Sequence, residues 1–347
     1  MVAALVIVMV VVGGFVRLSR AGLSIVEWDV VTGVIPPIGD AAWEQSFAEY
    51  QLTPEFQMVN RDMSLGAYQR IFYYEWAHRL IARLAGLFVV IPLLWFMWKK
   101  RLGLRESLRY WAIAGLFGVQ GTIGWIMVSS GLRDRPAVSH FRLTIHLLAA
   151  LLLLAIVGWM ALSRIRSQRN PDDAAATITR TGRVLSWTLM GVVVLQIAYG
   201  GLVAGLKAGH MSNTWPLMYG NLIPPKLLTA FEPWWRGLVE PVGSHWVHRW
   251  LAFVVAGVAL ALIGTALRDG TSKGKLRGTL IWLSTALTAQ IVLGIYVVLL
   301  GVPKWLALAH QGVGVVVFCV ALVLTHESHW TRHQLSVSTP EKLAARG

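Results

Sequence analysis

The chain has 347 residues, of which 56% are hydrophobic and only 14% are charged. A soluble domain carries about a quarter charged residues, so this composition excludes an ordinary soluble protein and indicates an integral membrane protein. The formal net charge of +14 does not indicate a nucleic-acid-binding protein, because the basic residues cluster in alternate loops between apolar segments.

Eight apolar segments are candidates for membrane spans, each of which takes roughly 20 mostly apolar residues. The first segment is short and begins at the initiator methionine, but no small-residue cleavage site follows it. We therefore predict a membrane span there, shortened at its start, rather than a signal peptide. The eight predicted spans lie near residues 2–16, 72–98, 108–130, 138–163, 184–206, 245–267, 278–300 and 304–326.

The distribution of basic residues predicts the orientation of these spans. Lysine and arginine cluster between spans two and three, four and five, and six and seven, whereas residues 17–71 carry four basic and seven acidic side chains. Because basic loops tend to stay in the cytoplasm, we predict a multi-pass protein of the cell inner membrane with both termini cytoplasmic. The long loops 17–71 and 207–244 then lie on the outer, periplasmic side.

The first outer loop contains an element of its own. Residues 40–47 predict a short amphipathic helix with Asp40 as its N-cap. Two interpretations of the outer loops remain open. They either connect the spans and do nothing more, or they cover the outer mouths of the helix bundles.

The second half of the chain repeats the first half in order. An even number of spans per copy gives both copies the same orientation, so the repeat is parallel. We predict an all-α integral membrane fold in which eight transmembrane helices form two tandem four-helix bundles related by a parallel pseudo-two-fold repeat. The predicted units are residues 1–170 and residues 171–347, the second with a cytoplasmic tail. The matched elements are Gly13-Gly14, Ala21-Gly22, Trp28 and Ile35-Pro36-Pro37 in the first half, and Gly200-Gly201, Ala208-Gly209, Trp215 and Ile223-Pro224-Pro225 in the second.

One repeated pentapeptide carries the strongest functional signal. Glu75-Trp76-Ala77-His78-Arg79 returns as His245-Trp246-Val247-His248-Arg249, and a second histidine follows each copy, His146 and His310. Two imidazoles from facing helices can bind one heme iron from opposite sides, whereas a zinc site would want four ligands closer in sequence. The alternative is four histidines that only hydrogen-bond to neighbouring groups. The matched pairs favour two hemes, both toward the outer side. Gln120 and Gly124 also match Gln290 and Gly294.

Arginine follows the first histidine of each pair, at Arg79 and Arg249. An arginine inside a membrane is costly and is usually paired. A heme offers two propionates, and a guanidinium binds carboxylates well, so we predict that these arginines bind propionates. The alternative is that both side chains extend to the outer membrane interface.

The two copies differ in ways that separate their roles. Glu75 stands three residues before His78 and shares a helix face with it, where the second copy has His245. The first unit also has Arg83 and Arg142, where the second has Phe253 and Leu306. A carboxylate beside a heme can accept a proton or stabilise a developing cation. The N-terminal unit is therefore the candidate reaction site, unless Glu75 only forms a salt bridge with a neighbouring arginine.

The motifs resemble those of heme A synthase in its mitochondrial and alphaproteobacterial form. The resemblance covers nearly the whole chain and implies an inner-membrane oxidoreductase that oxidises the porphyrin methyl group of heme O to the formyl group of heme A through an alcohol, for cytochrome oxidase assembly. It implies heme b on His248 and His310, and heme O as substrate at His78, His146 and Glu75. The other branch of the family has a cysteine pair in an outer loop, and none exists here. The motifs are Gly14-Phe15-Val16-Arg17-Leu18-Ser19-Arg20-Ala21-Gly22-Leu23-Ser24, Val26-Glu27-Trp28, Thr32-Gly33-Val34-Ile35-Pro36-Pro37, Pro54-Glu55-Phe56 and the pentapeptide with its three partner histidines.

Several questions stay open at this level. Two histidines on one iron leave no position for oxygen, so either one ligand leaves, or electrons are removed and water attacks a methyl cation. Alternative functions are a diheme b-type membrane cytochrome that transfers electrons and a carrier that delivers heme to an oxidase. Candidate partners are a membrane electron donor of unknown identity, heme O synthase, cytochrome oxidase assembly factors and a second copy of the chain. No nucleic acid is expected.

Overall fold

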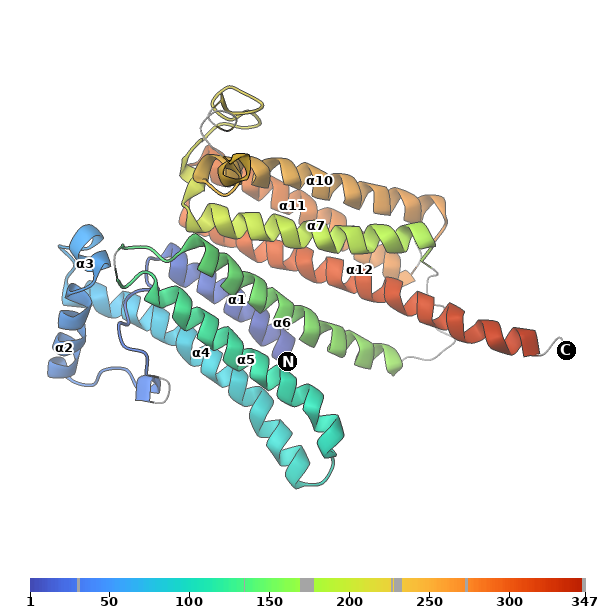
Figure 1. Cartoon of the computed structure of the whole chain (residues 1–347), viewed down its shortest axis with the longest axis horizontal. Coiled ribbons are helices and arrows are strands. Elements are labelled where there is room, and N and C mark those ends of the chain that lie inside the picture. Colours follow the sequence, from blue (N-terminus) through green and yellow to red (C-terminus); the bar gives the residue numbers. More distant parts are fainter. Residues whose placement is uncertain are drawn as a thin grey trace. The chain divides into compact units, whose positions relative to one another are not determined.

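The structure is a computed structural model that describes residues 1–29, 32–133, 135–168, 178–225, 227, 233–271 and 274–344. The described residues are helical between their loops and form no β-sheet. All eight predicted spans are helices (Figure 1). They are α1 (Val2–Leu18), α4 (Leu65–Trp98), α5 (Leu104–Ser129), α6 (His140–Ser167), α7 (Arg180–Gly205), α10 (Pro241–Arg268), α11 (Gly274–Leu299) and α12 (Lys304–Ala344).

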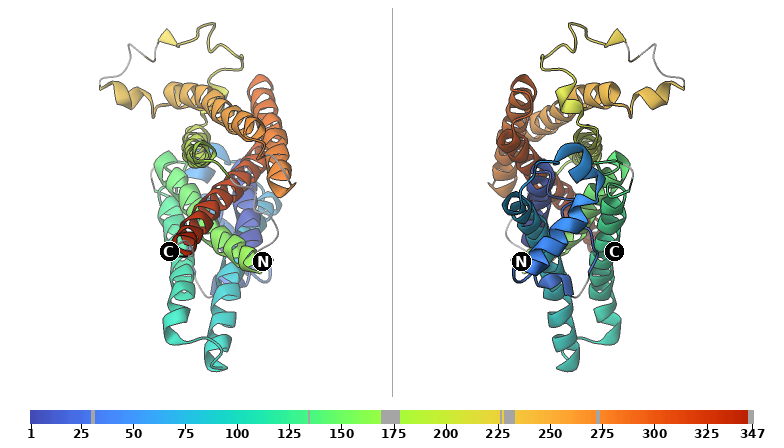
Figure 2. Two further views of the ribbon diagram at one scale, coloured as in Figure 1. Left: turned by 90° about the vertical axis from the view of Figure 1, so that its right-hand side faces the viewer. Right: turned by 90° about the vertical axis from the view of Figure 1, so that its left-hand side faces the viewer.

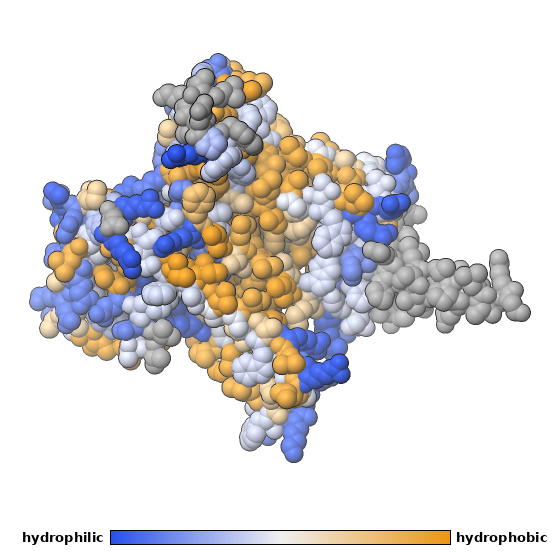
Figure 3. All heavy atoms as spheres, in the orientation of Figure 1, coloured by the Kyte–Doolittle hydropathy of each residue, from blue (hydrophilic) through white to orange (hydrophobic). Residues whose placement is uncertain are grey.

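The long helices have the surface of a membrane protein. Within the described part of the chain, seven of them are long and apolar enough to cross a bilayer, and α1 is a shorter apolar helix. Their outward side chains are large and hydrophobic, as at Ile91 (59% exposed), Leu260 (68%) and Trp282 (63%). An exposed apolar surface of this extent is unfavourable in water but favourable in contact with lipid. Figure 3 shows hydrophobic side chains spread over these helices and hydrophilic ones gathered at the ends of the chain's helical segments. The protein is therefore a multi-pass membrane protein.

The chain divides into two compact units. Unit 1 comprises residues 1–157 with 204–206, and unit 2 comprises residues 158–203 with 207–347. The boundary predicted near residue 170 falls in the segment 169–177, which lies outside the described residues. Each unit contains one copy of the pentapeptide and the two histidines that belong to it.

In unit 1 an outer segment packs on the start of α4. This helix has 34 residues, so it is about 50 Å long and exceeds the roughly 30 Å of a bilayer core. Its first turns carry Tyr68 and Phe72, which pack with Trp43 and Tyr50 of α2 (Asp40–Gln51) into one buried aromatic cluster. The short helices η1 (Thr32–Val34) and α3 (Pro54–Val59) complete the segment. Figure 2 shows α2 lying across the end of α4.

Local sequence explains where these outer helices begin. Thr53 caps α3, with Pro54 in the first turn, and Ser64 caps α4 by accepting a hydrogen bond from the Ala67 N–H at 3.3 Å. The prediction that Asp40 caps α2 is wrong by one position. Gly39, with φ 82°, is the N-cap, and Asp40 lies in the first turn. There its negative charge still faces the positive end of the helix dipole.

Unit 2 has the same succession of long helices with a different outer loop. Its long helices are α7, α10, α11 and α12, and α11 packs along α12. The outer loop contains η2 (Ala208–His210) and α9 (Trp234–Gly237). Pro241 begins α10 at its first turn, the position that proline favours because its missing N–H has no helical partner there.

Candidate functional site

Each predicted iron ligand of unit 1 lies against a glycine of a neighbouring helix. His78 of α4 lies over Gly13 of α1, and His146 of α6 lies over Gly124 of α5. A Cβ atom at Gly13 would lie 3.1 Å from His78 Cε1, and one at Gly124 would lie 3.0 Å from His146 Cε1. Carbon atoms in good contact lie about 3.5–4.0 Å apart. A Cβ atom at either position would therefore require its imidazole to shift by a few tenths of an ångström.

Unit 2 repeats this contact twice. A Cβ atom at Gly200 of α7 would lie 3.2 Å from His248 Cε1, and one at Gly294 of α11 would lie 2.9 Å from His310 Cε1. All four histidines thus rest on a glycine of the helix that precedes them among the long helices. This fourfold arrangement gives the matched glycines a physical role, which is to hold an imidazole edge close to the backbone.

The imidazoles of His248 and His310 face each other in unit 2. Their ring centroids lie 6.3 Å apart, and their planes are 79° to each other. A metal ion bound about 2.0–2.1 Å from each nitrogen, with about 1.1 Å from nitrogen to ring centre, would separate the centroids by about 6.3 Å. The spacing therefore fits one iron between the two rings.

Hydrogen bonds also prepare these two rings for a metal. His248 Nδ1 lies 3.2 Å from the Gln196 carbonyl oxygen, and His310 Nδ1 lies 3.1 Å from the Gln290 carbonyl oxygen. A ring that donates from Nδ1 carries its lone pair on Nε2, the nitrogen left for the metal. The Gln290 amide nitrogen lies 3.3 Å from His310 Nε2, so an iron bound to this nitrogen would replace that contact. The donor set in unit 2 fits a heme iron.

The histidine pair of unit 1 has different surroundings. His78 and His146 both belong to unit 1, and each lies against a glycine of the preceding long helix. The Gln120 amide nitrogen lies 3.2 Å from His146 Nδ1 and donates to the His146 carbonyl oxygen at 3.0 Å. His78 Nδ1 is buried, and no described residue hydrogen-bonds to it. Among the described residues, no carbonyl oxygen accepts from either of these rings, unlike the rings of their counterparts in unit 2.

Glu75 is a buried carboxylate that the first outer loop surrounds. Its side chain is 4% exposed. One oxygen accepts from the Ser24 N–H (2.8 Å), the Ser24 hydroxyl (2.8 Å) and the Ile25 N–H (3.0 Å). The other accepts from Arg79 Nε (3.1 Å) and Nη2 (2.6 Å). The salt bridge weighed in the sequence is present, and three loop donors add to it.

Arg79 and Arg249 bind equivalent carbonyl groups of the two outer loops. Arg79 donates to Ile25 O and Glu27 O, both at 3.1 Å. Arg249 donates to Ser212 O at 3.2 Å and to Thr214 O at 2.7 Å. Ser212 and Thr214 are the repeat equivalents of Ile25 and Glu27, at the same sequence offset that relates Trp28 to Trp215. Four of the five N–H groups of Arg79 have acceptors. This leaves at most one N–H for a propionate unless the loop moves.

The tryptophan of each pentapeptide fixes the same loop further along. Trp76 Nε1 donates to Val34 O at 3.1 Å, and Trp246 Nε1 donates to Leu222 O at 2.8 Å. Val34 and Leu222 both precede the Ile-Pro-Pro motif of their loop. The pentapeptide thus joins the loop to the turn that carries the iron ligand, which favours covering loops over plain connections.

His245 takes the place of Glu75 in unit 2. It is 2% exposed, and its Nε2 accepts from Arg249 Nε at 3.0 Å. A neutral imidazole therefore supports the arginine where unit 1 uses a negative charge. Histidine in place of glutamate keeps a hydrogen bond to the arginine that binds the loop, and it removes the negative charge.

The two further arginines of unit 1 also bind backbone carbonyls. Arg83 Nη2 donates to Asp29 O at 2.6 Å, and Arg142 Nη1 donates to Ile126 O at 2.9 Å. Arg83 extends the series that Arg79 begins along the first loop. Arg142 ties α6 to the end of α5, one turn before His146.

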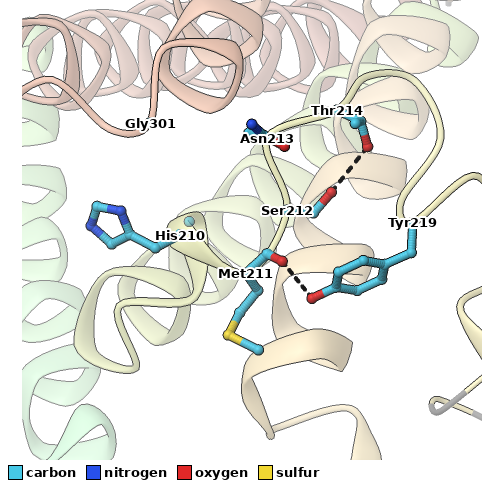
Figure 4. A pocket seen from close by; sticks show the side chains of 8 residues that line it. His210, Met211, Ser212, Asn213, Thr214, Tyr219 and Gly301 are labelled. Atoms are coloured by element: carbon cyan, nitrogen blue, oxygen red, sulfur yellow. Dashed lines mark hydrogen bonds between the residues drawn. The ribbon is translucent and has the colours of Figure 1, made fainter.

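The loop of unit 2 folds back on itself beside these contacts. It encloses a cavity of about 440 Å³ lined by residues 209–214, Tyr219 and Gly301. Figure 4 shows the Ser212 and Thr214 hydroxyls hydrogen-bonded to each other, at 3.1 Å, and Tyr219 donating to the Met211 carbonyl. The cavity lies in the segment whose carbonyls Arg249 binds, so the arginine supports a folded loop.

We expect Arg249→Ala to release this loop. A hydrogen bond to a charged group contributes about 1.5–3 kcal/mol, so losing two should raise amide exchange in residues 208–221 at least about tenfold. Hydrogen–deuterium exchange with mass spectrometry measures this directly. Arg236→Ala is the matched control, because the Arg236 side chain is 63% exposed and forms only a 3.9 Å contact with Glu240. Equal exchange in both variants would contradict the anchoring role.

Comparison with known proteins agrees with this arrangement. The chain is 41% identical over 345 residues to a heme A synthase of Rhodopseudomonas palustris (strain BisA53), covering 99% of this chain and 93% of the relative. It is 40% identical over 348 residues to a heme A synthase of Bradyrhizobium sp. (strain ORS 278), covering 100% of this chain and 94% of the relative. A heme A synthase of Sphingopyxis alaskensis is 38% identical over 325 residues, covering 94% of this chain and 89% of the relative. The COX15-CtaA family model, described as cytochrome oxidase assembly protein, matches residues 1–322. With two matched histidine pairs, duplicated loop contacts beside them and a family match over residues 1–322, the chain belongs to the COX15-CtaA family of cytochrome oxidase assembly proteins.

Proposed function

We propose that this chain is a heme A synthase that oxidises the methyl group of heme O to the formyl group of heme A through an alcohol, for cytochrome oxidase assembly. The family match and the relatives that carry this name support it. The observation that carries the assignment of sites is the inequality of the two histidine pairs. One pair has carbonyl acceptors on both rings, and the other has a buried carboxylate nearby.

Unit 2 would hold heme b on His248 and His310. A bound heme b supplies one-electron transfer to or from the substrate site. The chain's contribution is to keep both rings fixed, because carbonyl acceptors orient the imidazoles and raise their basicity as ligands. Arg249 would meet a propionate with its remaining N–H while it continues to anchor the outer loop.

Unit 1 would hold heme O as substrate, with His78 and His146 as iron ligands and Arg79 beside a propionate. Glu75 lies three residues before His78, on the same face of α4. A carboxylate has about four lone-pair positions, and five donors reach this one. A proton could bind Glu75 only by displacing a donor. The contacts therefore favour Glu75 as a fixed negative charge that stabilises a developing cation, over Glu75 as the base.

The membrane topology is part of the proposal. The relatives are bacterial, which supports a cell membrane, and we place the chain in the cell inner membrane. The basic loops near residues 99–109, 164–183 and 268–277 would be cytoplasmic, together with both termini. The outer loops and both heme sites would then lie toward the periplasm. Docking to heme O synthase, to oxidase assembly factors or to a second copy, and the identity of the electron donor, stay predictions.

Pigment extraction tests the function. The chain is purified from cells that also make heme O, and its hemes are separated and quantified. We expect heme B together with heme O or heme A. Heme B alone, at two per chain, would contradict the synthase and support a diheme b-type cytochrome, and the absence of heme B would contradict the assignment of unit 2.

A further inference from the structure

The four glycines that contact the histidines differ in the residue that lies one helical turn before each of them. Three of the glycines follow a glutamine by four residues, at Gln120, Gln196 and Gln290. The fourth, Gly13 of α1, follows Met9 by the same spacing. Positions four apart lie on one helix face, so each glutamine is placed beside the histidine that the glycine faces. His78 alone has a methionine at this position.

The three glutamines all contact their histidines. Gln120 and Gln196 donate through Nε2 to the carbonyl oxygens of His146 and His248, both at 3.0 Å. The Gln290 side-chain nitrogen lies 3.3 Å from His310 Nε2, and the Gln290 backbone carbonyl oxygen lies 3.1 Å from His310 Nδ1. Each of these amides restrains its histidine from a second helix.

His78 has no such restraint. A methionine thioether has no N–H to donate, and the buried Nδ1 of His78 has no hydrogen-bond partner among the described residues. His146, by contrast, is contacted twice by the Gln120 amide nitrogen, which donates to its carbonyl oxygen at 3.0 Å and lies 3.2 Å from its Nδ1. Of the two ligands available to the substrate iron, His78 is therefore the more weakly held.

We infer that His78 is the displaceable ligand of the substrate iron and that His146, positioned by Gln120, is the ligand that retains it. The inference rests on the proposed function, since it places heme O in unit 1. Dissociation of His78 would open one coordination position on the side of α4, the helix that also carries Glu75. Dissociation of His78 would thus explain how an iron that is held by two histidines can bind a third ligand.

Two ligand variants test the inference. We expect His78→Ala to keep the heme of unit 1 as a five-coordinate, high-spin species, and His146→Ala to lose that heme. Electron paramagnetic resonance and pigment extraction report both, and the heme b of unit 2 shows whether each variant has folded. Equal loss in both variants, or retention only in His146→Ala, would overturn the assignment.

Carbon monoxide added to the dithionite-reduced protein gives a readout without turnover. It should bind the unit 1 heme by displacing His78, and Met9→Gln should slow this binding about fivefold, the effect of the one neutral hydrogen bond that the new amide supplies. Met9→Leu is the control and should bind carbon monoxide at the wild-type rate. An unchanged rate in Met9→Gln would contradict the role of this position.

The proposed function and the inference about His78 can be contradicted independently of each other. Wild-type pigment that contains heme B alone would contradict the proposed function. The carbon monoxide rates of the Met9 variants would still decide whether His78 is the displaceable ligand of whichever heme unit 1 holds.

Discussion

Replacing Glu75 by glutamine should reduce conversion of heme O to heme A by about a hundredfold or more, because removing one charge-stabilising group from a reaction site typically costs that much. Glutamine keeps the size of the side chain and one oxygen that can accept from the loop. It removes the negative charge that Ser24, Ile25 and Arg79 hold in place. Heme O, the alcohol and heme A are quantified in extracts of cells that make heme O, and the heme b spectrum should be unchanged.

A matched variant separates charge from loop anchoring. Ser24→Ala removes the hydroxyl donor at 2.8 Å but keeps the carboxylate and the Ser24 N–H contact. One neutral hydrogen bond contributes about 1 kcal/mol, so conversion should stay within about fivefold of wild type. If Ser24→Ala lost as much activity as Glu75→Gln, the role of Glu75 would be to anchor the loop. Normal conversion in Glu75→Gln would show that the charge is not needed.

Replacing Gly294 by alanine should lower the heme b content of the site that we propose on His248 and His310. The new Cβ atom would lie 2.9 Å from His310 Cε1, so the imidazole must move away from its place opposite His248. Overpacking of this kind costs about 1–3 kcal/mol, which corresponds to roughly 10–100-fold weaker binding if the ring bears the cost. The reduced absorption spectrum of the purified variant measures the remaining heme b.

Gly278→Ala is the control for this effect. Gly278 lies on the same helix, α11, and a Cβ atom there would have nothing within 4 Å. It should keep full heme b, and alanine should support the helix slightly better than glycine. Equal heme content in the two variants would contradict the packing role of Gly294. Heme O bound in unit 1 should be retained in both.

Much of the fold could be predicted from the sequence because it depends on local composition. Apolar segments of sufficient length predict the long helices, and all eight are present. The span predicted near residues 72–98 is part of a longer helix, because α4 begins at Leu65. The added residues, about two turns, include Tyr68, whose ring packs on Tyr50 and Trp43 of α2. This tertiary packing extends the helix beyond its apolar span, and the N-cap Ser64 is a local signal that the span prediction did not include.

The histidines and Glu75 could also be found from the sequence, because an internal repeat marks them. Their partners could not. Ser24 and Ile25 reach Glu75 from about 50 residues earlier in the chain, as hydrogen-bond partners that leave no periodic signal. Gln196 was missed, although its spacing to Gly200 equals that of Gln120 to Gly124. The repeat between the two halves reveals the matched histidines. Gln196 follows from a different pattern, inside each half, in which every histidine is paired with the long helix that precedes it.

This pattern has a consequence for how the protein responds to mutation. Every contact that positions a histidine lies within its own unit, from Gly13 and Gly124 in unit 1 to Gly200 and Gly294 in unit 2. Substitutions at distant sites with no shared partners combine additively. Natural variation could therefore weaken the hold on one iron to allow exchange while the other iron stayed permanent. A single substitution at one of these glycines or glutamines would then change the affinity of one proposed heme site and leave that of the other unchanged.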